Sequence, residues 1–259
     1  MRPAHYPYLL EHWPGVDYLE IISENFLGDA PGPREKLARL RARYPVVLHG
    51  VGLNLLGASP LDEAYLDRLC RLADAVDAPF VTDHLCWTGA PGLSHHDLLP
   101  VPYTDDLVAL AAERAAHVQR RLGRPFGLEN LSSYATFRRS TMPEWAFHAA
   151  VVREAGCWSL LDLNNIHVSS RNHGLAPALY LQAVDFSRVL QVHLAGHTRE
   201  PDGLLIDTHD HPVSDDVWSL YAEAWRLGGP FPTLLERDER IPPVPDLLAE
   251  LARARQERA

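Results

Sequence analysis

Six short apolar runs of the sequence each end in a side chain that can bind a metal ion. They end at His49, His84, Glu129, Asp162, His193 and Glu236. Imidazole and carboxylate groups without thiolates suit iron, manganese or zinc, and the residue types alone do not decide among them. One such histidine could simply be a hydrogen-bonded core residue. Six polar groups at the same relative position would be costly to bury without a cation, so the repetition predicts a metal centre.

Two loops add candidate ligands to this set. His96 follows the third apolar run, and Asp207 and His209 follow the sixth. About eight candidate ligands could hold two or three ions. Carboxylates such as Glu129 and Asp162 could bridge closely spaced cations and reduce their mutual repulsion.

The runs that carry these side chains are expected to be parallel β-strands. Seven mostly continuous apolar runs alternate with helical patterns, as in successive βα units whose strands are buried on both faces. The predicted strands are residues 18–22, 45–49, 80–84, 125–129, 159–163, 189–194 and 233–236. Helices are expected to start near Ser59, Thr104 and Ser214 and to cover residues 143–155 and 177–184.

The chain length favours one α/β domain, a TIM-type (β/α)8 barrel over residues 1–259. Its 259 residues are close to the ~250 typical of this fold, in which the carboxyl ends of the strands meet at one mouth. Seven strands leave an eighth unassigned. Either residues 204–207 supply it, or the first strand is missing at the N-terminus, and the residues from Arg253 onward are expected to form a loose charged tail.

Composition excludes several classes of function. The net charge of −10 argues against binding to nucleic acid or anionic lipid. No apolar run is long enough to span a membrane, and the first residues lack the apolar core of a signal peptide. Three scattered cysteines agree with a reducing compartment, so we expect a cytoplasmic protein.

The sequence resembles the multinuclear non-haem iron-dependent oxidase family, whose best-known members act in methanobactin and related peptide natural-product pathways. The resemblance spans nearly the whole chain and rests on an ordered set of motifs. They are HGVGL (49–53), TDHL (82–85), HDLLPVPYT (96–104), LENLSSY (128–134), LLDLNN (160–165), SSRNHG (169–174), HLAGH (193–197), DTHDHPV (207–213) and ERD (236–238).

The resemblance implies a TIM-barrel oxidase with two or three irons. Such an enzyme uses dioxygen to modify residues, often cysteine, of a ribosomally made precursor peptide, and usually works with a separate protein that binds the peptide leader. Family members usually begin with a glycine-rich first strand just before a segment like residues 2–6. Here the sequence starts at Met1 without it, so we expect either that the chosen start omits this strand or that the barrel is incomplete.

The family's site residues carry over onto matching positions of this chain. The implied ligands are His49, His84 or His96, Glu129, Asp162, His193, Asp207, His209 and Glu236, with Asn165 as a further candidate. Among them, Glu129, Asp162 and His193 are expected to act in catalysis. Substrate contacts are expected from Asn130, Asn165, Arg171, Asn172 and His173, although residues 171–174 could equally form a turn.

Other classes of protein can use the same ligand set. A metal-dependent barrel isomerase of the xylose isomerase kind, or an endonuclease-like phosphodiesterase, would also bind its ions through histidine and carboxylates. A phosphodiesterase acting on DNA would need a basic rim, which the acidic composition disfavours. A barrel that only stores metal would need no open coordination position.

Overall fold

The computed structural model describes residues 1–28, 30–90 and 93–257, with the backbone alone for residues 93–96. The chain divides into two compact units. Unit 1 comprises Met1–Val101, Asp105–Glu129 and Val151–Trp158, and unit 2 comprises Pro102–Thr104, Asn130–Ala150 and Ser159–Ala259. None of the helices in the described part of the chain has the length and hydrophobicity needed to cross a bilayer.

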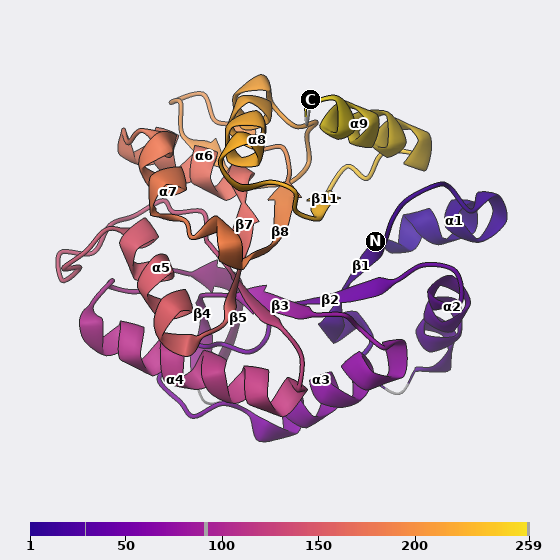
Figure 1. Ribbon diagram of the computed structural model, residues 1–259, viewed down its shortest axis with the longest axis horizontal. Coiled ribbons are helices and arrows are strands. Elements are labelled where there is room, and N and C mark those ends of the chain that lie inside the picture. The colour runs from indigo at the N-terminus through magenta and orange to yellow at the C-terminus, as the bar shows by residue number, and fades with distance from the viewer. Residues whose placement is uncertain (29, 91–92, 258–259) are drawn as a thin grey trace. The chain divides into compact units, whose positions relative to one another are not determined.

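All seven predicted strands are present, and neighbouring strands in each unit are parallel (Figure 1). The strands of unit 1 follow in the order β1 (Leu19–Ile22), β2 (Val46–Gly50), β3 (Val81–His84) and β6 (Phe126–Glu129). Those of unit 2 follow as β7 (Trp158–Asp162), β8 (Val189–Leu194) and β11 (Thr233–Leu235). Parallel strands in chain order, joined by helices, are the pattern of a TIM-type barrel.

The residues proposed for the eighth strand lie elsewhere. Strand β10 (Leu205–Ile206) pairs only with β9 (Thr198–Arg199), antiparallel and outside the parallel sheet. Residues 204–207 are therefore not the eighth strand of a barrel, and the described residues contain seven parallel strands.

The helices lie between and around these strands. In chain order they are α1 (Tyr6–His12), α2 (Pro31–Arg41), α3 (Glu63–Val76), α4 (Asp105–Leu122), α5 (Glu144–Ala155), α6 (Leu163–His173), α7 (Pro177–Ala183), α8 (Asp215–Gly228) and α9 (Val244–Gln256), with short 3-10 turns η1 (Pro3–His5), η2 (Ser23–Asn25) and η3 (Phe186–Arg188). The expected starts of α4 and α8 are confirmed. Helix α3 begins later than expected, because the Asp62 side chain, rather than Ser59, accepts the capping hydrogen bond from Tyr65 N at 3.0 Å.

Three segments differ from the sequence-based expectation. Residues 163–173 form helix α6, because the Asp162 carboxylate caps the helix start, and Gly174 ends it in the left-handed conformation. The segment with His96 is not a loop but strand β5 (Leu93–Leu99), paired with β4 (Trp87–Ala90). The C-terminal tail is helical as far as Gln256, and Arg253 forms an ion pair with Asp215 (2.9 Å).

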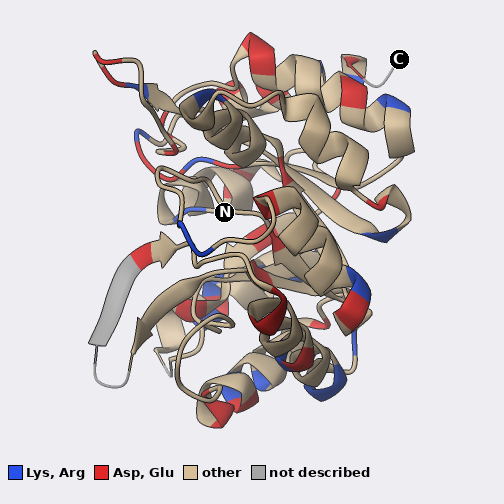
Figure 2. Cartoon of the chain, turned by 90° about the vertical axis from the view of Figure 1, so that its left-hand side faces the viewer, with Lys and Arg blue, Asp and Glu red and all other residues tan. Residues whose placement is uncertain are grey.

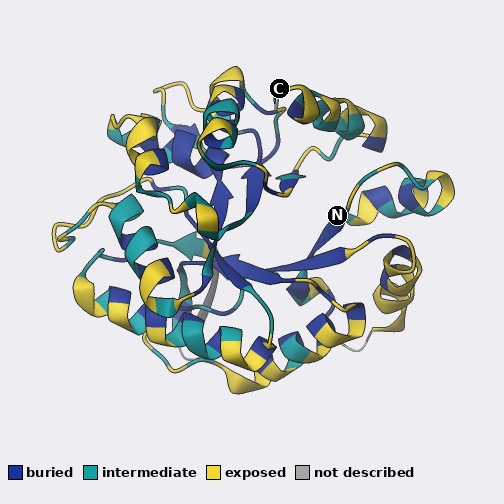
Figure 3. Ribbon diagram, in the orientation of Figure 1, coloured by how far each residue is buried: buried dark blue, intermediate teal, exposed yellow. Residues whose placement is uncertain are grey.

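The parallel strands are buried because most of their side chains are apolar, and the candidate metal ligands on them lie at or near the carboxyl ends of the strands. In Figure 3 most of the parallel strands are dark blue, the colour of buried residues. Leu48, Leu128 and Leu161 are fully buried, and each such side chain stabilises the fold by roughly 1.5–3 kcal/mol. The core of unit 2 continues through Trp218 and Tyr221 of α8. This apolar interior holds the strand ends rigidly.

Candidate metal centre

In unit 1, two histidines and a glutamate converge at the ends of three neighbouring strands. His49 is the second-last residue of β2, His84 ends β3, and Glu129 ends β6, where it pairs in register with His84. Both imidazole Nε2 atoms lie 3.2 Å from Glu129 Oε2, and the three side chains are almost completely buried. We call His49, His84 and Glu129 the first cluster.

The hydrogen bonds of the first cluster fix which ring nitrogens carry protons. His84 Nδ1 lies 3.0 Å from Gly50 O, an atom that can only accept. His49 Nδ1 lies 2.8 Å from Thr82 Oγ1, whose own proton goes to Leu48 O. Both Nδ1 atoms therefore donate, which in a neutral imidazole leaves Nε2 as the nitrogen that can bind a metal ion.

Three acceptor atoms that face one another fit a metal ion well. The facing atoms of the first cluster lie within 4.8 Å of one another. Histidine ligands of metals commonly donate their second ring nitrogen to a carbonyl or hydroxyl group, as both do here. The residues present thus fit a cation bound by two imidazoles and a carboxylate.

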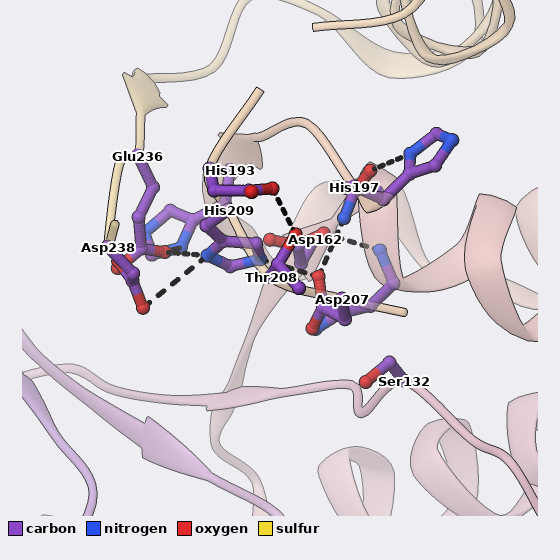
Figure 4. Close-up of polar contacts among 12 residues, drawn as sticks. Ser132, Asp162, His193, His197, Asp207, Thr208, His209, Glu236 and Asp238 are labelled. Atoms are coloured by element: carbon purple, nitrogen blue, oxygen red, sulfur yellow. Dashed lines mark hydrogen bonds and ion pairs between the residues drawn. The ribbon is translucent and has the colours of Figure 1, made fainter. Parts of the chain in front are cut away.

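In unit 2, a second cluster joins strand ends with a loop (Figure 4). Asp162 ends β7, Glu236 follows β11, and His209 lies in the loop after β10. One ligand atom from each lies within 4.8 Å of the others. His193 on β8 pairs in register with Asp162, and its Nδ1 lies 3.3 Å from Glu236 Oε2. We call these four residues, with Asp207, the second cluster.

His209 is the centre of the ion pairs in the second cluster. Its Nε2 lies 2.7 Å from Asp207 Oδ1, and its Nδ1 lies 3.5 Å from Glu236 Oε2 and 3.8 Å from Asp238 Oδ2. His209 has a left-handed backbone (φ 49°), a conformation that costs a non-glycine residue on the order of 1 kcal/mol. The ion pairs offset this cost and hold the ring between carboxylates.

Burial and charge shift the pKa values in the second cluster in opposite directions. Burial raises the pKa of Asp162 to about 7, against the lowering effect of His209. Burial would lower the pKa of His209, but Asp207 and the other nearby carboxylates raise it well above its ordinary value. Burial likewise opposes the ionisation of Glu236, yet hydrogen bonds with His193 and His209 hold its pKa well below the usual range.

Asp162 is held by residues that were predicted to bind substrate. Asn130 bonds the Asp162 backbone twice: its Nδ2 donates to Asp162 O (3.0 Å) and its Oδ1 accepts from Asp162 N (2.9 Å). Asn165 N donates to Asp162 Oδ1 (2.7 Å), while Asn165 Nδ2 donates to Asn130 O (3.0 Å). The Oδ2 atom of Asp162 is buried without a hydrogen-bond partner among the described residues, which suits a metal ligand.

The other predicted substrate residues lie at the end of α6. Asn172 makes a reciprocal pair with Leu205, donating from Nδ2 to its carbonyl and accepting from its N–H, both at 2.9 Å. His173 Nε2 lies 2.9 Å from Ser133 Oγ. Arg171 is exposed. Asn172 therefore positions β10, which leads directly into Asp207.

His96 was also predicted as a ligand, and its side chain lies outside the described part of the structure.

Several residues that position the clusters were missed from the sequence. Thr82 binds His49, Gln191 contacts His193 Nε2 (3.0 Å), and Asn164 donates to Asp207 Oδ1 (2.6 Å). Gln191 could have been found, because it lies two residues before His193 and so shares its face of the strand. Thr82 and Asn164 act across the fold, and the sequence pattern contains no signal for these contacts.

Asp83, which the sequence placed beside His84 at a strand end, and Glu24, which was missed, form a further set of polar residues in unit 1. Asp83 is fully buried and accepts from His84 N (2.8 Å) and Leu53 N (3.3 Å). Burial, reinforced by Glu24, raises its pKa well above the usual value. A Cβ atom on Gly50 would lie 2.3 Å from Asp83 Oδ2, so only glycine lets the chain after His49 approach this carboxyl.

A protein-family model matches the chain over residues 1–259, and its description is RiPP precursor modification enzyme MbnB/TglH/ChrH. The chain belongs to this family. It is therefore an enzyme of the class that modifies the precursors of ribosomally synthesised and post-translationally modified peptides, and the predicted family is confirmed.

Relatives of this RiPP precursor modification enzyme match along nearly its whole length. A UPF0276 protein of Caulobacter vibrioides is 50% identical over 258 residues, covering 98% of this chain and 92% of that protein. A UPF0276 protein of Acaryochloris marina is 44% identical over 254 residues, with 98% and 91% covered.

Solved structures with low sequence identity share the fold. A xylose isomerase-like TIM barrel protein from Mycobacterium smegmatis has a TM-score of 0.61 at 14% identity, covering 95% of this chain and 86% of that one. D-psicose 3-epimerase from Clostridium cellulolyticum H10 has a TM-score of 0.64 at 13% identity, with 100% and 94% covered. The predicted TIM-barrel fold class is thus confirmed.

Proposed function

We propose that this enzyme is a multinuclear iron-dependent oxidase that uses dioxygen to modify residues, cysteine among them, of a ribosomally synthesised precursor peptide. The observation that carries the proposal is the pair of buried clusters, each with histidine and carboxylate atoms within 4.8 Å of one another. No thiolate belongs to either cluster among the described residues. Bound iron with such ligands supplies the activation of dioxygen.

The first cluster would hold iron through His49, His84 and Glu129. The second would hold it through Asp162, His209 and Glu236, with His193 and Asp207 as further ligands or as partners of those ligands. Most of these side chains lie at the ends of strands, which keeps their ligand atoms in place without a metal, so little reorganisation is needed when iron binds. The carboxylates offset the positive charge of two or three ions.

The substrate follows from the family. Its description names a RiPP precursor, so the substrate is a precursor peptide. We propose that a separate protein binds the leader of this peptide and that the reaction takes place in the cytoplasm.

Oxygen uptake tests the function directly. Protein purified without oxygen, loaded with iron and mixed with a cysteine-bearing precursor peptide should consume dioxygen and change the mass of the peptide. Protein loaded with zinc or magnesium should do neither. Turnover that needs no oxygen and proceeds equally well with zinc would contradict the oxidase and favour an isomerase or a phosphodiesterase.

A further inference from the structure

A loop in unit 2 exposes two aromatic rings and two arginines, and its first residue, Tyr134, contacts the second cluster. Residues 134–139, which we call the 134–139 loop, are all exposed, and the tip of the connection between β6 and α5 is yellow in Figure 3. Tyr134 is 46% and Phe137 38% exposed, and Arg138 and Arg139 follow directly. Adjacent exposed aromatic and arginine side chains are typical of binding surfaces.

Hydrogen bonds fix both ends of this loop. Ser133 Oγ lies 2.9 Å from His173 Nε2, and Asn172 Nδ2 donates to Ser133 O (3.4 Å). After the loop, Thr141 N donates to Tyr103 O (2.8 Å). The exposed rings therefore project from a chain whose ends are held in place, which lowers the entropy lost when a ligand binds.

Tyr134 connects the loop with the second cluster. Its hydroxyl accepts a hydrogen bond from Asp207 N (3.0 Å) and lies 3.2 Å from Ser132 Oγ. Asp207 in turn contacts His209 at 2.7 Å, and Ser132 is drawn beside Asp207 in Figure 4. A ligand that covers the exposed ring of Tyr134 would thus lie against a residue that directly contacts Asp207, a proposed iron ligand.

The charge of the loop indicates the chemistry of its ligand. Neither Arg138 nor Arg139 forms an ion pair with the described residues, although the protein has a net charge of −10. Elsewhere red and blue segments occur together on several helices (Figure 2), and arginines such as Arg121 and Arg226 pair with nearby acids. Two unpaired arginines beside aromatic rings fit an acidic peptide segment with an apolar side chain.

We propose that the 134–139 loop is the docking surface for the precursor peptide, and that it selects an acidic residue next to an apolar one, close to the residue that is modified. This inference rests on the proposed function, because it takes the second cluster as part of the reaction site. The aromatic rings contact the apolar side chain, and the two guanidinium groups pair with the carboxylate.

A displayed library of short random peptides around a fixed cysteine tests the proposal. The library is selected without oxygen on the iron-loaded protein, and the affinity of an enriched peptide is then measured by fluorescence anisotropy. The variants are R138S/R139S and Phe137→Ser, with the exposed pair R39S/R120S as a control of equal charge change. Circular dichroism and iron content are recorded for each protein.

The expected result is enrichment of aspartate or glutamate beside an apolar residue. R138S/R139S should weaken binding of the enriched peptide about tenfold, and added salt should weaken wild-type binding more than variant binding. Phe137→Ser should weaken binding independently of salt, while R39S/R120S should bind like the wild type.

Two outcomes would overturn the docking proposal: selected peptides without an acidic excess, or equal affinity of wild type and R138S/R139S. In the first case the loop would be open to a folded partner protein instead. Failure of the proposed oxidase function would be seen separately, as absent iron-dependent oxygen uptake in a wild-type protein that still selects acidic peptides.

Discussion

The histidines in the two clusters of candidate metal ligands differ in their hydrogen-bond partners and in their charge. In the first cluster, His49 and His84 each donate Nδ1 to a neutral oxygen and present an acceptor to Glu129. In the second, His209 lies between Asp207 and Glu236 and, with its pKa raised, carries a proton that compensates these carboxylates. We therefore expect the first cluster to depend on a metal ion more strongly than the second.

This difference indicates how each cluster binds its ion. An ion that enters the first cluster fills a position already surrounded by acceptor atoms. An ion that binds His209 must displace a proton, so its apparent affinity falls as the pH falls. Changes in the first cluster should therefore have larger effects on metal content than changes that only loosen the second.

The largest effect is expected from Glu129→Gln, which keeps the size of the side chain and removes its charge. Two imidazoles and an amide bind a divalent cation weakly, so the variant should lose at least one metal equivalent and about a hundredfold or more of its activity. Metal analysis and turnover on one preparation check this. The exposed Glu113→Gln is the control, and unchanged iron and turnover in Glu129→Gln would make Glu129 a purely structural carboxylate.

A smaller effect is expected from Asn172→Leu, which removes both hydrogen bonds to Leu205. The β10 segment would then hold Asp207 and His209 less firmly, and metal affinity in the second cluster should fall roughly 30-fold. A chelator competition should show one weakened and one unchanged class of metal. Equal weakening of both classes of metal would show that the two clusters are not independent. The control is Asn25→Leu on the surface, which should leave the affinity of both classes unchanged.

Thr82→Val should weaken the first cluster by about tenfold in metal affinity. The substitution keeps the shape of the side chain but leaves His49 Nδ1 without its acceptor, so the ring can turn or change tautomer. The same competition experiment should now show the other class of metal weakened. Thr136→Val, in the exposed loop, is the matched control. Unchanged metal affinity in Thr82→Val would show that this hydrogen bond does not orient His49.

The last prediction concerns stability rather than metal binding, and a carboxyl outside both clusters. Burial raises the pKa of Glu144 to about 8, despite its hydrogen bond with Tyr180 (3.0 Å). The protonated form is favoured in the folded state, so stability is highest below the unfolded pKa and falls as the pH rises toward 8. Glu144→Gln should remove this fall and stabilise the protein at pH 8 by about 1–3 kcal/mol in urea unfolding. A wild-type stability that stays constant over this range would contradict the assignment.

The strands and the candidate ligands at their ends could be predicted from the sequence because each is a local pattern. A β-branched or leucine-rich run that ends in histidine or a carboxylate is visible along the chain, and register pairs such as His84 with Glu129 confirm the predicted phase. Helix α6 was missed because its polar sequence LNNIHVSSRNH lacks an apolar stripe. Its start depends on Asp162, which was considered only as a ligand.

The supporting contacts could not be predicted, because they join residues far apart in the sequence. Asn130 reaches the backbone of Asp162, 32 residues later, and Asn172 reaches Leu205, 33 residues later. Both were expected to contact substrate, since an asparagine near a site has no sequence feature that separates the two roles. Only the fold shows that their amides pair with backbone groups.

Metal analysis of anaerobically purified protein tests the central claim most directly. If both clusters bind iron, the wild type should contain at least two iron equivalents per chain, and Glu129→Gln should contain at least one fewer. Stoichiometric zinc in place of iron, or the same iron content in both proteins, would contradict the account.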